Sequence, residues 1–315
     1  MKNKDFVTRV ISSVILVAIL LLAGLVGGFA ILIFCVVVAF VGMKELYMAV
    51  GLYDKNAKDK KDNMLAIAGM VMCIIYFLMS GTFAPLISAR SFAMKNAFPD
   101  SLSGYIEITD MIGLVNTLSY LSASALYVFA VITVMALIYV FTFKRFDFKQ
   151  VSYAIVGALY TPLFVTSIFL IRCLNGGKYL FWLIFISSWI CDTCAYLVGC
   201  NFGKHKMAPV LSPKKSVEGA IGGVVGSVIV AFIFGYFVQH KLFSGNNYAT
   251  EYMIICLVGA CFSQVGDLFA SAIKRNNDIK DYGNLIPGHG GILDRFDSII
   301  MIAPLFSIFV TAGIM

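Results

Sequence analysis

The sequence predicts an all-α polytopic integral membrane protein of about nine transmembrane helices, with its N-terminus in the cytoplasm and its C-terminus outside. Sixty per cent of the 315 residues are hydrophobic and 13% are charged, against about 45–50% and about 25% in soluble domains. The apolar residues form uninterrupted blocks, as helices immersed in lipid require. The polar segments between these blocks indicate on which side of the membrane each connection lies.

A bilayer core needs about 20 apolar residues per helix. By that length the predicted spans are residues 10–27, 29–50, 64–85, 119–143, 151–172, 179–200, 216–238, 252–275 and 296–314. Gly27 and Gly28 separate the first two spans, and we expect them to form a tight turn. The basic start of the chain is typical of a signal peptide, but the apolar run continues to about residue 50 without a small-residue cleavage site. We therefore expect retained helices.

The basic residues favour one orientation. With a cytoplasmic N-terminus, all but five of the 24 Lys and Arg residues lie on the cytoplasmic side, as the positive-inside rule expects. The exceptions are Arg90, Lys95, Arg172, Lys178 and Lys241. We divide the chain into an N-terminal transmembrane region, 1–150, with spans one to four, and a C-terminal transmembrane catalytic region, 151–315, with spans five to nine. Residues 86–118 are predicted to form a long outside loop with room for one short interfacial helix.

Composition also argues against two other classes of site. The net charge of +7 is spread over short connections between apolar blocks, so topology and anionic phosphate groups explain it better than nucleic acid, and we expect no nucleic-acid partner. Cys191 and Cys194 form a C-x-x-C, but no second pair or nearby His completes a zinc site. They flank Asp192 within a predicted helix, where cysteine behaves as a small hydrophobic residue.

Two acidic residues lie inside predicted spans, where a charge is costly and points to function. Asp192 and Asp267 each lie about eight residues from the cytoplasmic end of their helix, roughly 12 Å deep at 1.5 Å per residue. Asp267, Ser271 and Lys274 follow one another at i, i+4 and i+7, which places them on one helix face. The alternative is that each acid is only paired with a lysine or a hydroxyl within the bundle. The matched depth favours a polar cavity that opens to the cytoplasm.

The most polar stretch follows the eighth span and ends in Pro287-Gly288-His289-Gly290-Gly291 and Asp294-Arg295-Phe296-Asp297. Its glycines allow backbone N–H groups to approach an anion closely, and the start of the ninth span offers a helix N-terminus that attracts phosphate. Acids beside basic residues and a glycine loop are typical of metal-assisted phosphate chemistry.

A second basic connection, residues 199–219, contains Ser212-Pro213-Lys214-Lys215 close to Asp192 in the chain. Such a loop has a plain topological use, because it keeps this side of the protein in the cytoplasm. Its paired lysines and prolines beside a buried acid favour contact with phosphate.

Residues 271–297 resemble the signature of the phosphatidate cytidylyltransferase family. Ser271, Lys274-Arg275, Lys280-Asp281, the His-Gly-Gly segment and the closing Asp-Arg-x-Asp match it at the constrained positions. Residues 192–219 resemble a second block of the family, with Cys194 standing where a smaller residue is expected. The resemblance covers about residues 180–315, and the N-terminal spans agree only in being hydrophobic.

The resemblance implies that a phosphate oxygen of phosphatidic acid attacks the α-phosphorus of CTP, giving CDP-diacylglycerol and pyrophosphate. It implies Mg²⁺ held by Asp267 and Asp294, with Asp192 and Asp297 as further candidates. The implied catalytic residues are Asp267, Asp294, Lys274 and His289. The implied substrate-binding residues are Ser212, Lys214, Lys215, Ser271, Arg275, Lys280, Gly290, Gly291 and Arg295. His289 fits two roles equally: an acid for the departing pyrophosphate, or a structural residue that fixes the glycine loop.

The resemblance further implies a multi-pass protein of the cell (cytoplasmic) membrane in contact with membrane lipid, an active site that faces the cytoplasm, and a homodimer. It also allows a monovalent cation such as K⁺. The alternatives are a related CTP-dependent lipid kinase, acting on a polyprenol or phytol, or a CDP-archaeol synthase. From a different class, an ion-coupled transporter would also place Asp192 and Asp267 within the membrane, but it has no evident use for the charged glycine loop.

Overall fold

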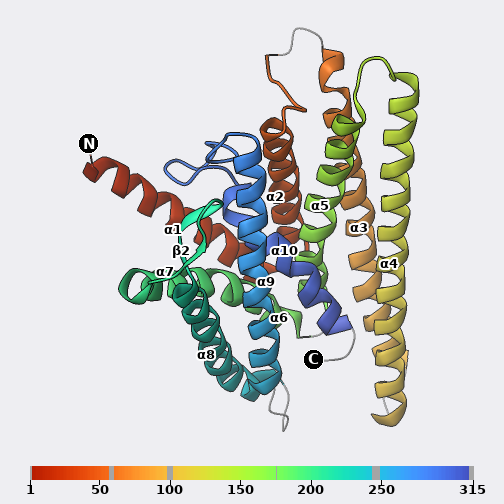
Figure 1. The fold of residues 1–315 in the computed structure, drawn as a ribbon. Helices are drawn as coiled ribbons and strands as arrows, with labels where there is room; N and C mark the ends of the chain where they lie inside the picture. The colour runs from red at the N-terminus through yellow and green to blue at the C-terminus, as the bar shows by residue number, and fades with distance from the viewer. Residues whose placement is uncertain (1, 57–59, 98–101, 175, 243–248, 312–315) are drawn as a thin grey trace. The chain divides into compact units, whose positions relative to one another are not determined.

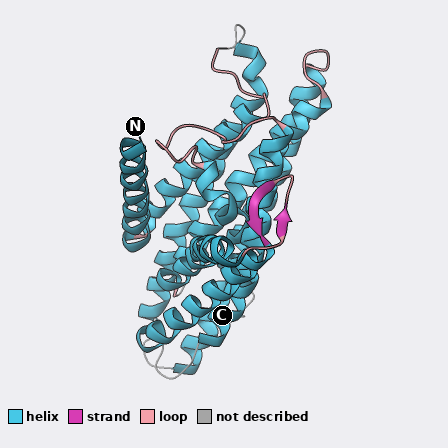
Figure 2. Ribbon diagram, turned by 60° about the vertical axis from the view of Figure 1, so that its left-hand side comes forward, coloured by secondary structure: helices cyan, strands magenta, loops and turns pink. Residues whose placement is uncertain are grey.

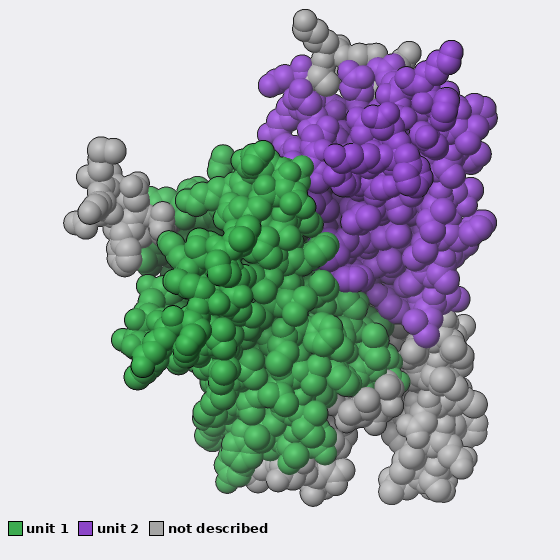
Figure 3. Space-filling view, viewed as in Figure 1, with its two compact units in different colours: residues 1–31, 167–315 green, residues 32–166 purple. Residues whose placement is uncertain are grey.

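The structure, a computed structural model, describes residues 2–311 except 57–59, 98–101, 175 and 243–248. It is all-helical apart from one short hairpin (Figures 1 and 2). The helices group into two compact units, residues 1–31 with 167–315 and residues 32–166 (Figure 3). The division at residue 150 concerns topology and catalytic role, and it stays a prediction.

The unit of residues 32–166 consists of long apolar helices around a core of tyrosines. The helices are α2 (Gly28–Ala49), the 3₁₀ turn η1 (Lys60–Asn63), α3 (Met64–Ala97), α4 (Leu102–Phe141) and α5 (Phe148–Cys173). The ring of Tyr47 is fully buried in a slot between Gly69 of α3 and Gly157 of α5, where a Cβ atom would overlap it. Its hydroxyl donates to the carbonyl of Ala154 at 2.7 Å.

A proline in α5 explains a second buried tyrosine. Pro162 has no N–H, so the carbonyl four residues before it, that of Ala158, loses its helical partner. The hydroxyl of Tyr127 on α4 donates to this carbonyl at 2.6 Å. The Tyr127 ring stacks on Tyr76 of α3, with 4.3 Å between ring centroids. The Tyr127 hydroxyl thus supplies the hydrogen bond that the Ala158 carbonyl needs inside an apolar core.

The other unit carries the first helix and the C-terminal half of the chain. Its elements are α1 (Lys2–Val26), α6 (Gly177–Phe185), the π-helical segment η2 (Ile186–Ile190), α7 (Cys191–Phe202), β1 (Lys206–Ala208), β2 (Ser212–Ser216), α8 (Val217–Leu242), α9 (Ala249–Asn276) and α10 (Leu293–Thr311). α6, η2 and α7 follow one another without a break, so they form one helical run with a widened turn just before Asp192. Such π-helical turns occur frequently at functional sites.

Helices α7 and α8 approach closely because glycines face small side chains. A Cβ on Gly223 would lie 2.6 Å from the carbonyl oxygen of Cys191 and 3.0 Å from its sulfur. One on Gly226 would overlap the sulfur of Cys194. The two thiols therefore fill the helix contact as small side chains, and Cys191 is fully buried.

Seven helices of the described residues are long and apolar enough to cross a membrane, which shows an all-α polytopic membrane protein. They correspond to the second to eighth predicted spans. The other two predicted spans fall on α1, whose apolar part, Val10–Val26, is shorter, and on α10. Both are helical in the structure.

Two predicted connections differ from the structure. The expected loop 86–118 is helical in its described parts, because α3 runs to Ala97 and α4 begins at Leu102. A hydropathy pattern predicts only the apolar part of a helix. A polar segment that continues the same helix keeps its backbone hydrogen bonds, so the pattern does not show where the helix ends. At 1.5 Å per residue α4 is roughly 60 Å long. Residues 199–219 contain the hairpin of β1 and β2, in which Lys206 lies opposite Ser216 and Ala208 opposite Ser212.

Candidate functional site

Asp294 organises the glycine loop between α9 and α10. One carboxylate oxygen, Oδ1, accepts from the Lys274 ammonium at 2.9 Å, and the other, Oδ2, accepts from the backbone N–H groups of Tyr282 at 2.8 Å and Gly291 at 3.0 Å. The Asp294 side chain is 3% exposed and that of Lys274 is 11% exposed. The Tyr282 ring lies beneath the ammonium, 5.2 Å from it. Both ends of the loop therefore attach to one buried ion pair.

The backbone of the loop requires glycine at two places. Gly288 and Gly290 adopt φ angles of 76° and 84°, which other residues rarely adopt. A Cβ on Gly290 would also lie 2.9 Å from Oδ2 of Asp294. The turn closes with a hydrogen bond from the N–H of Ile286 to the carbonyl of Gly290 at 2.8 Å. The glycines thus allow the loop to fold down onto the carboxylate.

The second basic segment reaches the same helix. Lys215 of β2 forms an ion pair with Asp267 of α9, and each side chain is 27% exposed. Glu218, in the first turn of α8, holds the start of the hairpin: its carboxylate accepts from the N–H of Lys204 at 3.0 Å and pairs with the His205 ring at 2.6 Å. The hairpin therefore projects Lys215 over the acid that the sequence singled out.

The remaining acids lie near this pair. Asp192 interacts electrostatically with Asp267, Lys215 and Arg295, and Asp297 interacts with Asp267, Lys274 and Asp192. Asp192 is exposed, whereas Asp297 is 7% exposed. Carboxylates from three separate helices, α7, α9 and α10, thus repel one another across a shared space.

Close helix packing makes this arrangement possible. A Cβ on Gly266, next to Asp267, would lie 3.1 Å from the Cα of Ser298 and 3.2 Å from the carbonyl oxygen of Asp297. The hydroxyls of Ser188 in η2 and Ser298 in α10 hydrogen-bond at 2.8 Å. α10 is therefore held against both α9 and the widened turn that precedes Asp192.

His289 makes contacts that the sequence did not predict. Its two ring nitrogens lie 2.9 and 3.0 Å from the hydroxyls of Ser12 and Ser13 on α1. Its carbonyl accepts from the Arg295 guanidinium at 2.9 and 2.7 Å. His289 is thus bonded at both its side chain and its backbone.

The other predicted site residues take ordinary positions around this centre. Ser271 is buried on α9, one turn from Lys274. Arg275 donates to the carbonyl of Ile279 at 3.1 Å. Lys214 and Lys280 are exposed, and Ser212 is half-buried on β2. The roles of all these residues stay predictions.

Four residues that the sequence did not single out as site residues help to build the site: Ser12, Ser13, Glu218 and Tyr282. Two signals were available for them. Adjacent serines in an apolar span, such as Ser12 and Ser13, indicate contacts, because each hydroxyl needs a partner in lipid. An acid in the first turn of a helix favours contact with N–H groups.

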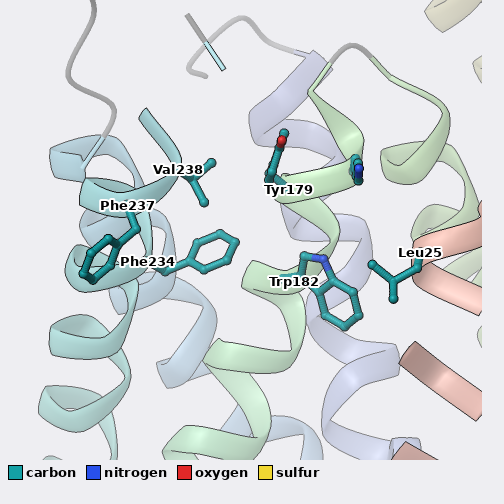
Figure 4. Close-up of a pocket in the computed structure, with 7 residues that line it drawn as sticks. Leu25, Tyr179, Trp182, Phe234, Phe237 and Val238 are labelled. Atoms are coloured by element: carbon teal, nitrogen blue, oxygen red, sulfur yellow. The ribbon is translucent and has the colours of Figure 1, made fainter. Parts of the chain in front are cut away.

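A separate apolar pocket of about 400 Å³ lies at the other end of α6 (Figure 4). Trp182 and Tyr179 of α6, Phe234 and Phe237 of α8, and Leu25 of α1 line it. Tyr179 and Trp182 precede Asp192 by thirteen and ten residues, roughly 15–20 Å along a helix. Apart from Lys178, its lining residues are aliphatic or aromatic, whereas carboxylates and cations gather at the charged end of the unit.

The charged end combines cations that can bind phosphate oxygens with carboxylates suited to a hard metal ion. Among the described residues no group of three or more His, Cys, Asp or Glu side chains is arranged to hold a metal by itself. Mg²⁺ usually takes one or two carboxylates and completes its shell with substrate phosphates and water. Fold and site together therefore define a polytopic membrane protein with a site suited to a phosphate-bearing substrate.

Comparison with known proteins gives the family. The model of the cytidylyltransferase family matches residues 7–312, and the chain belongs to this family. A phosphatidate cytidylyltransferase of Staphylococcus haemolyticus is 36% identical over 165 residues, which cover 52% of this chain and 61% of the relative. A protein of the same name from Staphylococcus aureus is 37% identical over the same shares. One from Haemophilus influenzae is 44% identical over 133 residues, 42% of this chain and 46% of the relative. The chain thus matches less than two thirds of the length of these relatives.

Proposed function

We propose that this protein is a phosphatidate cytidylyltransferase, which transfers CMP from CTP to phosphatidic acid and releases CDP-diacylglycerol and pyrophosphate in phospholipid biosynthesis. One observation carries the proposal: Lys215, Lys274 and Arg295 meet the carboxylates of α7, α9 and α10 at one end of the unit. The family and the names of the relatives support this assignment.

The reaction makes modest demands on acid–base groups. A phosphate oxygen of phosphatidic acid forms a bond to the α-phosphorus of CTP, and the bond from that phosphorus to the bridging oxygen of the β-phosphate breaks, so pyrophosphate carries away the electron pair. The nucleophile is already an anion. Catalysis then depends on bringing two anions together and on neutralising their charge. Lys274, Arg295 and Lys215 can do this, and the exposed residues Lys214, Arg275 and Lys280 add positive charge.

The carboxylates fit Mg²⁺, because all the donors are oxygens and the acids repel one another. When bound, Mg²⁺ would neutralise charge on the triphosphate. Among the described residues Asp267 pairs with the partly exposed Lys215, so it would be the most available ligand, with Asp192 beside it. Asp294 uses both oxygens within the protein, so it could hold the metal only if Lys274 moved to a phosphate oxygen. Asp297 is the fourth candidate, and K⁺ is a candidate second cation.

The proposal includes nine spans, a cytoplasmic N-terminus and an outside C-terminus, which puts the charged site on the cytoplasmic side of the cell membrane. CTP would then enter from the cytoplasm and phosphatidic acid from the surrounding lipid. The distribution of Lys and Arg supports this orientation, and in this proposal α1 and α10 would be the two spans beyond the seven. A homodimer is also part of the proposal.

The test is incubation of the purified protein in detergent with α-³²P-labelled CTP, phosphatidic acid and Mg²⁺, with and without EDTA, followed by lipid extraction. We expect label in the lipid phase only when the metal is present. Labelled CDP without labelled lipid would instead identify a lipid kinase. Flux of an ion in vesicles without nucleotide turnover would identify a transporter. Label in the lipid with an archaeal ether lipid but not with phosphatidic acid would identify a CDP-archaeol synthase.

Two variants sharpen the test. Asp267→Asn removes a carboxylate from the centre of the site and is expected to lower turnover at least about 100-fold. Lys55→Ala removes an exposed cation from the connection after α2 and is expected to leave turnover unchanged. Equal loss of turnover in both variants would show that the site has been misplaced.

A further inference from the structure

We propose that the first helix, α1, positions the glycine loop between α9 and α10. Ser12 and Ser13 hold the His289 ring by hydrogen bonds, and the His289 carbonyl orients Arg295. This inference rests on the proposed function, because it assigns the purpose of the contact to CTP binding. The loop that follows α9 passes beside α1 (Figures 1 and 2). Ser12 and His289 are 277 residues apart in the sequence.

The hydrogen bonds fit one neutral tautomer of the His289 ring. The Ser12 hydroxyl donates to the carbonyl of Pro287 at 3.0 Å. A serine has one hydroxyl hydrogen, so toward His289 the Ser12 oxygen acts as acceptor, and Nδ1–H of the ring is the donor. In the neutral ring Nε2 then carries no hydrogen and accepts from the Ser13 hydroxyl. A neutral imidazole satisfies every group in this set.

This arrangement decides between the two roles that the sequence left open for His289. An acid for pyrophosphate needs a ring N–H aimed at the leaving oxygen. Both ring nitrogens are instead turned toward α1, and Nδ1–H is already used by Ser12. His289 is therefore a positioning residue.

Positioning reaches the substrate through the backbone. The carbonyl of His289 accepts two hydrogen bonds from the Arg295 guanidinium. These bonds orient the planar fork of the arginine, which is the group best suited to two phosphate oxygens at once. When the His289 ring is released, its carbonyl shifts and Arg295 loses its orientation.

α1 is suited to this task because it is anchored at a second point. Nε of Arg172 donates to the carbonyl of Gly24 at 2.8 Å near the end of α1. A Cβ on Gly24 would lie 3.1 Å from the ring of Trp182, so this end of α1 lies directly against α6. Between this anchor and Ser12, α1 is a continuous helix, so it holds Ser12 at a fixed distance from α6.

The first experiment measures the dissociation constant of labelled CTP for Ser12→Ala/Ser13→Ala. Each lost hydrogen bond is worth roughly a factor of two to ten, so we expect binding to weaken about tenfold. Ser12→Thr/Ser13→Thr keeps both hydroxyls and should bind like the wild type. Ser152→Ala, which removes an exposed helical hydroxyl bonded to the carbonyl of Phe148, is the matched control. Unchanged binding in the double alanine variant overturns the proposal.

The second experiment separates action through Arg295 from a general loss of structure. Arg295→Lys keeps the charge but cannot make both bonds to the His289 carbonyl. If α1 acts through Arg295, the two alanine substitutions cost less than about twofold in the Arg295→Lys background, because coupled residues are not additive. Additive losses in CTP binding overturn the proposed route.

The third experiment distinguishes the two roles of His289. His289→Asn has an amide that can bond Ser12 but no proton to give to a leaving group. We expect it to keep at least about a tenth of the turnover, with the pH profile of the wild type, and His289→Ala to lose more. An Asn variant as inactive as the Ala variant would identify an acid instead.

Hydrogen exchange of residues 286–292 keeps this inference apart from the proposed function. The double alanine variant should exchange these amides faster than the wild type without any nucleotide present. If the variant exchanges faster but the wild type does not bind CTP, the contact with α1 is upheld and the cytidylyltransferase assignment is rejected. Unchanged exchange would reject the contact whatever the reaction.

Discussion

Replacing Asp294 with Asn should unfold the glycine loop as well as stop turnover. The carboxylate serves the Lys274 ammonium with one oxygen and two backbone N–H groups with the other. An amide offers one acceptor oxygen, so its NH₂ group must face either the ammonium or the backbone donors. Because both side chains of the ion pair are buried, the change leaves an uncompensated charge, which costs about 3–5 kcal/mol. The unsatisfied N–H groups, at about 1–3 kcal/mol, are the smaller effect.

Thermal unfolding in detergent, followed with a thiol-reactive dye, measures this loss. Cys191 and Cys256 are buried in the same unit, whereas Cys200 and Cys261 are exposed. The exposed thiols are therefore blocked beforehand with a colourless alkylating agent, so that the dye reacts with the buried thiols when the unit opens. At about 2–4 °C per kcal/mol, the melting temperature should fall by roughly 10 °C. Adding Lys274→Met removes the unpaired charge and should restore most of the difference. If the single variant melts like the wild type, or the double variant melts no higher than the single one, this ion pair does not hold the loop.

Three further outcomes are expected. Asp267→Asn breaks an ion pair that is about a quarter exposed and so worth less than about 1 kcal/mol. The melting temperature of the variant should stay within about 3 °C of the wild type, whereas lipid labelling should be lost. A large fall in melting temperature would contradict this expectation. Tyr127→Phe leaves the Ala158 carbonyl without its donor and should destabilise the protein by about 1–3 kcal/mol. Adding Pro162→Ala restores a backbone donor and should recover the lost stability. If denaturant unfolding shows no such recovery, the explanation is wrong. Gly266→Ala inserts a methyl group 2.8 Å from Cβ of Met301 and 3.1 Å from Cα of Ser298, both in α10. It should reduce lipid labelling with little change in helix content by circular dichroism, and full labelling would show that the helix contact can relax.

The apolar runs predict most of the helices because burial in lipid leaves the backbone no other way to satisfy its hydrogen bonds. Where the chain becomes polar this constraint ends. Residues 86–97 and 102–118 then gave no signal that separates a loop from a helix that continues into water. The hairpin of β1 and β2 was missed for the same reason, since it is held mainly by Glu218 and by a short ladder.

The charged residues of the site could be predicted from the cost of acids in spans and from the glycine loop. Their pairing could not. Lys274 lies seven residues after Asp267 on one helix face, which suggests that the two act together, yet its partner is Asp294 and Asp267 pairs with Lys215. Side-chain partners depend on how three helices and a hairpin pack, and spacing along one helix does not contain that information. Contact between Ser12 and His289 is likewise a property of the folded unit.

The contact between α1 and the glycine loop has a consequence for biosynthesis. Ser12 leaves the ribosome long before His289, and at about 5–20 residues per second the intervening 277 residues take roughly 15–55 s. During that time the hydroxyls of α1 have no imidazole to meet, and the loop that will carry Arg295 does not exist. A nascent chain inserted into the membrane therefore has α1 without its loop contact until residues 289–295 have been made, so this contact forms long after α1 itself.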